Sequence, residues 1–131
     1  MKSPKEYVDE VKALINEVSV GELTQLLKDS ELVLIDIREH EEYVQGHVAN
    51  SVNLPRGVLE MKLTDHPVVA HHSDPNVALA DLAQRPIYLI CRSGGRSALA
   101  AQSLTVMGHP EVYSVAGGML EWEKQGLATT K

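Results

Sequence analysis

The 131-residue sequence has a single cysteine, no phenylalanine and no long hydrophobic run. One cysteine cannot form a disulfide within the chain, which is typical of a reducing compartment, so a cytoplasmic location is expected. The apolar runs are too short to span a bilayer, and residues 1–6 lack the apolar segment of a signal peptide. One tryptophan and four tyrosines are the only aromatic residues, so aliphatic side chains must supply most of the core.

Basic residues are also scarce, because 12 lysines and arginines face 18 aspartates and glutamates and give a net charge of −6. This balance disfavours nucleic acid and anionic membranes as partners. The length suits a single domain over residues 1–131, with its core at about residues 15–125. Residues 126–131 are expected to form a loose tail.

Short apolar runs alternate with segments of helical periodicity, which is the pattern of an α/β domain. Capping boxes at residues 3–6 and 19–22 predict two helix starts. The other predicted helices cover residues 39–44, 57–63, 74–82 and 98–107, and the predicted strands cover residues 15–18, 32–37, 52–54, 87–91 and 113–115. We therefore expect a mostly parallel central sheet of about five strands with helices on both faces.

Residues 64–73 separate two of these predicted helices and are expected to be a surface insertion in the same domain. The segment contains His66, His71 and His72. Adjacent histidines point in different directions on a helix or a strand, so His71 and His72 are not expected to bind one ion together. No carboxylate–histidine spacing resembles a known metal site, and the sequence predicts neither a metal nor a cofactor.

The only cysteine, Cys91, ends a predicted buried strand and is followed by Gly94, Gly95 and Ser97. Ligands of open α/β sheets bind at the carboxyl ends of strands. The glycines permit a loop whose N–H groups turn inward and attract an anion. Ser97 is predicted to be the N-cap of the next helix, whose positive end would face the sulfur. These features favour the reactive thiolate over an inert buried cysteine.

Two arginines, Arg92 and Arg96, add positive charge beside Cys91 in an otherwise acidic protein. A guanidinium can hold a small anion through paired hydrogen bonds, and Arg96 is expected to do so. For Arg92, a role in binding an anion and a role as a solvated surface charge are equally supported. The backbone N–H groups of residues 93–96 are expected to face inward and to stabilise a negatively charged sulfur, as in an oxyanion hole. The expected anion cradle consists of Arg92, Ser93, Gly94, Gly95, Arg96 and Ser97.

Four blocks of sequence carry a family resemblance. They are Asp-Ile-Arg-Glu at residues 36–39, residues 42–55 with their Gly46-His47 pair, Cys-Arg-Ser-Gly-Gly-Arg-Ser at residues 91–97, and residues 115–119 with Trp122. In this order they resemble the motifs of single-domain rhodaneses, which are sulfurtransferases that carry sulfur as a cysteine persulfide. The resemblance extends over about residues 18–125 and implies a rhodanese-like fold.

The resemblance implies that Cys91 is the catalytic nucleophile of a sulfurtransferase. Its thiolate would take the outer sulfur of a donor such as thiosulfate and pass it to cyanide or a thiol, in two steps without a cofactor. Asp36 and Arg38 are expected to form a structural ion pair that supports the site, and Gly117 and Gly118 a tight turn beside the Cys91 loop. By the same resemblance His47 has a packing role, and Trp122 is placed in the core.

Two other functions remain open. A persulfide relay would keep Cys91 but pass its sulfur to a partner protein, and would turn over small molecules slowly. A cysteine-dependent phosphatase is disfavoured, because those enzymes have five residues between cysteine and arginine, whereas four separate Cys91 from Arg96. The shorter loop makes a cradle that suits a sulfur atom and crowds a phosphate. The expected partners are a small anionic sulfur donor and a thiol, cyanide or protein acceptor.

Overall fold

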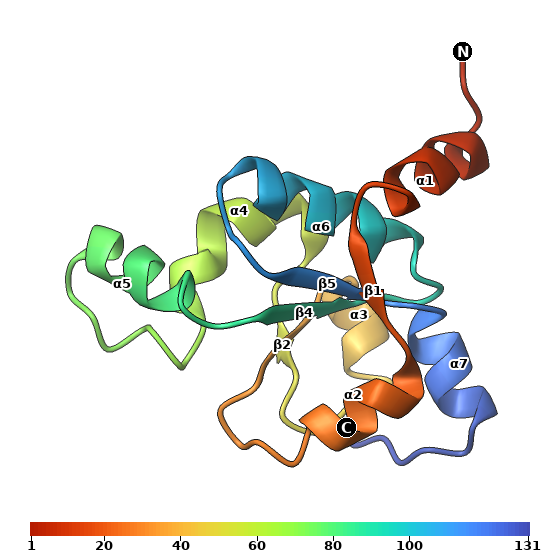
Figure 1. Cartoon of the computed structure of the whole chain (residues 1–131). Coiled ribbons are helices and arrows are strands. Elements are labelled where there is room, and N and C mark those ends of the chain that lie inside the picture. The colour runs from red at the N-terminus through yellow and green to blue at the C-terminus, as the bar shows by residue number, and fades with distance from the viewer.

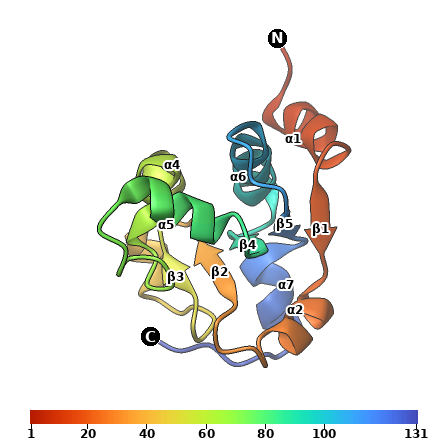
Figure 2. The same ribbon diagram turned by 60° about the vertical axis from the view of Figure 1, so that its left-hand side comes forward.

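The computed structural model describes all residues, 1–131, around one sheet of five parallel strands in the order β1-β5-β4-β2-β3 (Figure 1). The strands are β1 (Asn16–Val18), β2 (Val33–Asp36), β3 (Val52–Asn53), β4 (Ile87–Ile90) and β5 (Val112–Val115). β1 and β3 form the two edges (Figure 2). The predicted α/β class and parallel sheet are confirmed. Because the strands share one direction, all their carboxyl ends meet at the same edge of the sheet.

Helices cover both faces of the sheet. On one face lie α1 (Pro4–Lys12), α4 (Leu59–Lys62), α5 (Pro75–Leu82) and α6 (Gly95–Val106), and on the other lie α2 (Val20–Leu26), α3 (His40–Tyr43) and α7 (Gly118–Lys124) (Figure 1). Two short 3-10 helices, η1 (Arg56–Val58) and η2 (Leu63–Asp65), flank α4. None of these helices combines the length and the apolar character that crossing a bilayer requires.

The core consists of two aliphatic clusters, one on each face of the sheet. Along β4 and the residue after it, Ile87, Leu89 and Cys91 contribute to the cluster under α5 and α6. The alternate residues Tyr88 and Ile90 belong to the cluster with α2 and α7. This alternation is the two-residue period of a strand buried on both faces. It places Cys91 in the core at the point where the strand ends.

The helix starts at Ser3 and Ser19 form as predicted, each with both hydrogen bonds of a capping box. Asp74 caps α5, also as predicted. The start of α6 differs from the prediction. The helix begins at Gly95 and its N-cap is Gly94, whose φ of 97° is in the left-handed region. Ser97 is therefore not the N-cap but lies inside the first turn, because the glycine reaches a backbone angle that starts the helix earlier.

The segment of residues 56–73 is more broken and more buried than predicted. The expected helix at residues 57–63 is divided among η1, α4 and η2, although Leu59 and Leu63 do face the core. Within the predicted surface insertion, Val69 is fully buried and His66 is 5% exposed. Val69 belongs to the aliphatic core and Val68 packs against it, so the predicted insertion contributes to the core and is not a surface segment alone.

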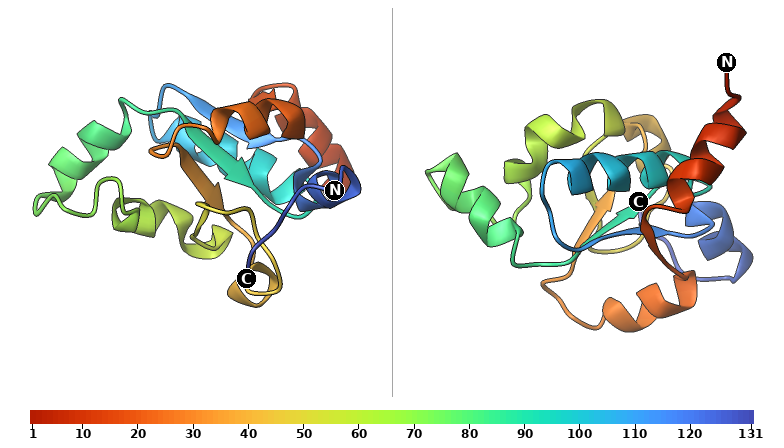
Figure 3. Two further views of the ribbon diagram at one scale, coloured as in Figure 1. Left: turned by 90° about the horizontal axis from the view of Figure 1, so that it is seen from below. Right: turned by 45° about the horizontal axis from the view of Figure 1, so that its top comes forward.

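The C-terminal residues are not a loose tail. They return towards the segment after α3, as the left view of Figure 3 shows, where His47 and Thr130 exchange two backbone hydrogen bonds of 2.9 Å. The indole Nε1 of Trp122 donates to the carbonyl of Ala128 at 3.0 Å. These contacts fix the chain end because they satisfy polar groups that would otherwise be solvated individually.

Candidate functional site

Cys91 lies directly after β4 at the carboxyl edge of the sheet, and its side chain is buried, with 1% of the residue exposed. Its Sγ accepts hydrogen bonds from the backbone N–H of Gly94 at 3.1 Å and of Ser97 at 3.4 Å. Both donors belong to the start of α6. Because the N–H groups of a first helical turn have no partner within the helix, they are free to bind the sulfur. Of the four N–H groups expected to face the sulfur, only that of Gly94 bonds Sγ, and the N–H of Ser97, which was not expected to do so, is the second donor.

Two serine hydroxyls continue from the sulfur into the core. The thiol of Cys91 donates to Ser97 Oγ at 3.4 Å, and Ser97 Oγ lies 2.7 Å from Ser114 Oγ of β5. Both serines are fully buried. A buried hydroxyl without a partner destabilises the fold, so this pair satisfies two polar groups beside Cys91. Either hydroxyl can be the donor within the pair.

The turn at the start of α7 packs closely against the loop that follows Cys91. Gly117 and Gly118 have positive φ values of 78° and 55°, and a Cβ on Gly118 would lie 2.7 Å from the carbonyl carbon of Arg92. The approach lets the N–H groups of Met119 and Leu120 donate to the carbonyls of Cys91 and Arg92, both at 2.9 Å. The predicted tight turn beside the Cys91 loop is thus present, and it orients the loop through its backbone.

Arg96 is already paired, which the sequence does not predict. Its two terminal nitrogens donate to the two carboxylate oxygens of Glu42 at 2.8 and 3.0 Å. The hydrogen bonds from Arg96 lower the pKa of Glu42 to about 2, and Glu42 in turn raises the pKa of Arg96, with a smaller contribution from the nearby Cys91. Arg96 therefore links the loop to α3, and its paired edge is not available to a donor.

Arg92 is the free cation at this site. It and Ser93 are exposed, and Arg92 makes no ion pair. The backbone N–H groups of Ser93, Gly95 and Arg96 donate to no protein acceptor. The loop that follows Cys91 therefore carries one guanidinium without an ion pair and three N–H groups without a protein acceptor.

Asp36 and Arg38 form the expected ion pair next to the site. Arg38 Nε lies 3.0 Å from one carboxylate oxygen of Asp36, Nη2 lies 2.8 Å from the other, and Nη2 also donates to the carbonyl of Gly46. Asn53 donates to the backbone carbonyls of both residues. These bonds hold the loop after β2 against the segment after α3. They leave no free group for acid–base chemistry, so the pair supports the structure.

His47 and Trp122 occupy the packing positions that the resemblance implies. The His47 ring stacks on Tyr43 with a centroid separation of 3.6 Å, and its Nδ1 lies 2.8 Å from the Tyr43 carbonyl. Trp122 is 5% exposed within the core cluster on the α2 side of the sheet. Neither residue contacts Cys91 by a hydrogen bond.

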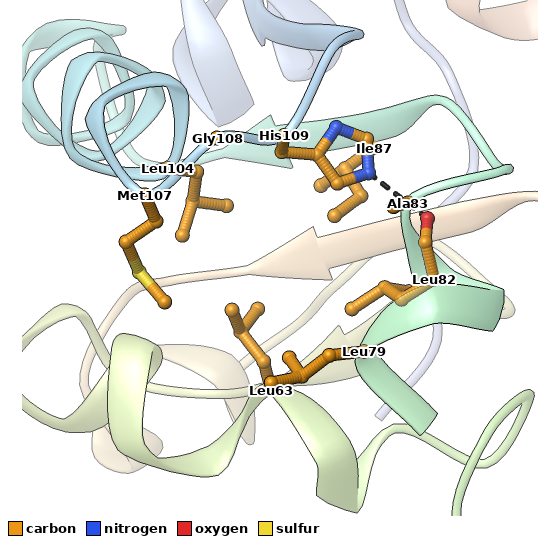
Figure 4. A pocket seen from close by; sticks show the side chains of 9 residues that line it. All are labelled: Leu63, Leu79, Leu82, Ala83, Ile87, Leu104, Met107, Gly108 and His109. Carbon is orange, nitrogen blue, oxygen red and sulfur yellow. Dashed lines mark hydrogen bonds between the residues drawn. The ribbon is translucent and has the colours of Figure 1, made fainter. Parts of the chain in front are cut away.

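An apolar cavity of about 140 Å³ lies at the other end of β4, between α5 and α6 (Figure 4). Its polar ring is His109, whose Nε2 bonds the carbonyl of Leu82 at 2.9 Å and whose Nδ1 accepts the N–H of Glu111. Because both nitrogens have partners, this cavity contains no free catalytic group. The chemistry therefore belongs to the Cys91 loop.

Two residues of the site, Glu42 and Ser114, are not predicted as such from the sequence. Ser114 is a polar residue within an apolar strand, and that interruption is a signal for a buried hydrogen bond. Glu42 gives no comparable signal, because an acidic residue in the first turn of a helix is ordinary. Its partner is 54 positions away in the sequence.

Comparisons with known proteins agree with this geometry. A model of the Rhodanese-like domain family matches residues 19–125. A sulfurtransferase from Allochromatium vinosum is 29% identical over 115 residues, which are 87% of this chain and 94% of that protein. A putative mitochondrial thiosulfate sulfurtransferase from Schizosaccharomyces pombe is 36% identical over 96 residues, which are 72% of this chain and 65% of that protein.

Among solved structures, a protein of unknown function from Rhodopseudomonas palustris, described as a possible tyrosine phosphatase, is similar with a TM-score of 0.80. The two chains are 27% identical, and the match covers 99% of this chain and 96% of that one. The family match extends over most of the chain and includes β2, the Cys91 loop and α7. The chain belongs to the family of rhodanese-like domains.

Proposed function

We propose that the protein is a sulfurtransferase that carries sulfane sulfur as a persulfide on Cys91, with thiosulfate as a donor. The observation that carries this proposal is the pair of backbone N–H groups, from Gly94 and Ser97, directed at Sγ. Two amides at the positive end of a 12-residue helix stabilise negative charge on sulfur. The sulfurtransferases among the relatives support the same reaction class.

In the first half-reaction, the Cys91 thiolate attacks the outer sulfur of thiosulfate. A bond forms between Sγ and that sulfur, the sulfur–sulfur bond of thiosulfate breaks, and sulfite leaves with the bonding electron pair. Arg92 binds the oxygen end of the donor, because it is the cation of the loop that has no carboxylate partner. The free N–H groups of Ser93, Gly95 and Arg96 hold the negative charge of the new outer sulfur.

In the second half-reaction, a nucleophilic acceptor attacks the outer sulfur of the persulfide. The bond between the two sulfur atoms breaks, its electron pair returns to Sγ, and the Cys91 thiolate is restored. With cyanide the product is thiocyanate, and with a thiolate it is a new persulfide on the acceptor. Two separate half-reactions through one covalent intermediate predict ping-pong kinetics.

The direct test is intact-mass spectrometry after mixing with thiosulfate. The wild-type chain should gain one sulfur atom and lose it again on addition of cyanide. Cys91→Ser should gain none and should not produce thiocyanate, and circular dichroism should show that it remains folded. If the wild-type chain takes up no sulfur from thiosulfate or from an organic persulfide, the proposed function is wrong.

The burial of Cys91 supports a second candidate function, a persulfide relay that serves a partner protein. With 1% of Cys91 exposed, the residue offers a donor little access in this conformation, so sulfur transfer requires a movement of the chain around it. Binding of a partner protein can supply that movement. The relay predicts a persulfide on Cys91 in the purified protein together with slow turnover of thiosulfate and cyanide, whereas fast turnover favours the enzyme.

A phosphatase reaction is less well supported by the site. The four-residue spacing gives a short loop, and both terminal nitrogens of Arg96 already bind Glu42. A phosphate would have to compete with that carboxylate for the guanidinium. Hydrolysis of an aryl phosphate, measured beside the thiosulfate and cyanide assay on the same preparation, compares the two activities directly.

A further inference from the structure

A second group of polar side chains lies at the end of the molecule away from Cys91. His71 and His72 belong to the chain that leads into α5, and Asp81 lies near the end of that helix. α5 precedes the amino end of β4, whereas Cys91 follows its carboxyl end, so the length of the sheet separates the two places (Figure 1). None of the three residues takes part in the chemistry of the Cys91 loop.

The two histidines share one side of the chain because they do not lie in a helix or a strand. Residue 71 ends a turn and residue 72 follows it, outside any regular element. Their ring centroids are 4.1 Å apart, with an angle of 39° between the rings. Adjacent side chains point in different directions only where the backbone is a regular helix or strand, which is the case that the prediction from the sequence assumes. Because the two histidines lie in and directly after a turn, they can face the same ion.

Asp81 completes a set of three ligand atoms. His72 Nε2 lies 2.9 Å from Asp81 Oδ2, and the ligand atoms of His71, His72 and Asp81 all lie within 4.8 Å of one another. Metal–ligand bonds of about 2.1 Å in a tetrahedral site separate neighbouring ligand atoms by about 3.4 Å. The widest pair then has to close by about 1.4 Å. His71 is exposed, so a rotation of its side chain is the movement that would close this distance.

The surroundings of Asp81 suit a ligating carboxylate. Arg85 Nε donates to Oδ1 at 3.1 Å, so one oxygen is oriented by a neighbour while Oδ2 faces the histidine. Ligating carboxylates typically have such an outer hydrogen bond. Glu31, 3.6 Å from Arg85, adds a second negative charge, so two carboxylates accompany one guanidinium. The local charge therefore favours a dication even when both histidines are neutral.

We propose that His71, His72 and Asp81 form a binding site for a divalent transition-metal ion of the zinc class, with water in the remaining position. Two imidazoles and one carboxylate suit zinc, nickel or copper, whereas calcium and magnesium prefer sites made of oxygen atoms. The ion takes the place of the hydrogen between His72 Nε2 and Asp81 Oδ2. It joins the chain before α5 to the last turn of that helix, so it stabilises the native state by mass action.

The test uses the untagged full-length chain with Cys91→Ser in every sample, because a free thiol also binds zinc. Isothermal titration with Zn²⁺ should give one site per chain. His71→Gln and Asp81→Asn should each weaken that site by at least about tenfold, because a three-ligand site retains little affinity with two. His40→Gln, which changes an exposed histidine outside this group, is the matched control and should bind like the parent.

Two further measurements give independent readouts. One equivalent of Zn²⁺ should raise the melting temperature of the parent, and this rise should disappear in Asp81→Asn. Proton NMR should show that the ring signals of His71 and His72 shift on addition of Zn²⁺, while those of His40 stay. The proposal is overturned if no zinc binds, or if His71→Gln and Asp81→Asn bind as tightly as the parent. Either result leaves the assignment of Cys91 untouched, since all samples lack its thiol.

Discussion

At the scale of single residues, the two arginines of the Cys91 loop have different environments, and this separates their roles. Arg92 is exposed and unpaired, whereas Arg96 is bound to Glu42. A free guanidinium can discriminate donors by charge, but a paired one mainly holds the loop in place.

We predict that Arg92→Ala raises KM for thiosulfate several-fold but changes the reaction with an uncharged sulfur donor little. Arg96→Ala should impair both donors about equally, because it releases the loop from α3. Rising salt should weaken thiosulfate binding to the wild type and to Arg96→Ala more than to Arg92→Ala. Lys28→Ala, on the surface after α2, serves as the charge-matched control. Selective loss of thiosulfate binding in Arg96→Ala would contradict this division of roles.

Ser114 acts on the sulfur through Ser97. When Ser114 donates to Ser97 Oγ, the hydrogen of Ser97 is free to point at a Cys91 thiolate. Loss of one such hydrogen bond is worth about 1 kcal/mol, which is about fivefold in rate. We therefore predict that Ser114→Ala lowers kcat/KM about fivefold and moves the pH profile of Cys91 alkylation by iodoacetamide to higher pH.

Ser103→Ala is the matched control for that experiment, since it also loses one side-chain hydrogen bond, from Ser103 to Glu60. It lies on α6 but makes no contact with the sulfur through hydrogen bonds. Its alkylation profile should coincide with that of the wild type. If the alkylation profile of Ser114→Ala does not shift, Ser114 packs in the core without affecting the Cys91 sulfur.

At the scale of elements, the position of the Cys91 loop depends on its contact with the start of α7. At Gly118 the backbone is left-handed, and an added Cβ would also collide with the Cys91 loop. At Gly126 the backbone is left-handed as well, with a φ of 71°, but an added Cβ would meet no other atom within 4 Å. Comparison of the two positions separates steric exclusion from backbone strain.

We predict that Gly126→Ala destabilises the fold by about 1–2 kcal/mol, the usual cost of left-handed backbone at a residue with a side chain. Gly118→Ala should destabilise it further and lower transferase activity, because the new methyl group displaces the carbonyl groups of Cys91 and Arg92. Urea unfolding of both variants gives the comparison. If the two variants lose the same free energy of unfolding, the Cys91 loop moves away from the new methyl group on residue 118 without further cost.

These elements also show how far the sequence could predict the structure. A continuous apolar run and the capping residue Asp74 are local signals, and they located β4, which ends just before Cys91, and α5. The start of α6 was misplaced because Gly94 adopts a left-handed angle that no side-chain pattern reveals. The bond between Glu42 and Arg96, and the return of Thr130 to His47, join segments far apart in the sequence, so they depend on the folded chain.

At the scale of the whole molecule, the stability of the fold should depend on His66, which directly follows η2 and is buried. Its Nδ1 accepts the N–H of Val68 at 3.2 Å, so Nε2 carries the hydrogen, and Nε2 is buried without a partner. Burial, and to a smaller extent the charge of Arg85, lowers the pKa of His66 below its usual value of 6.5. The folded state therefore favours the neutral ring more than the unfolded chain does.

The sign of the effect follows from which state binds more protons. As pH falls below 6.5, His66 of the unfolded chain takes up a proton that the folded chain excludes, so the free energy of unfolding decreases until the pH reaches the lowered pKa. One such group contributes up to about 1.4 kcal/mol per pH unit. Glu42 does not interfere in this range, because its stabilising effect is lost only below its unfolded pKa of 4.5, towards about 2.

We predict that the wild-type chain loses stability between about pH 7.5 and pH 5.5 and that His66→Gln loses less over the same interval, since the glutamine cannot titrate. His40→Gln, at an exposed histidine, should keep the slope of the wild type. Urea unfolding at the two pH values measures all three proteins. Because the slope is a difference within each protein, a general destabilisation of His66→Gln does not disturb the comparison. If His66→Gln retains the wild-type slope, other groups carry the acid sensitivity, and the buried ring takes up its proton without unfolding the segment that contributes to the core.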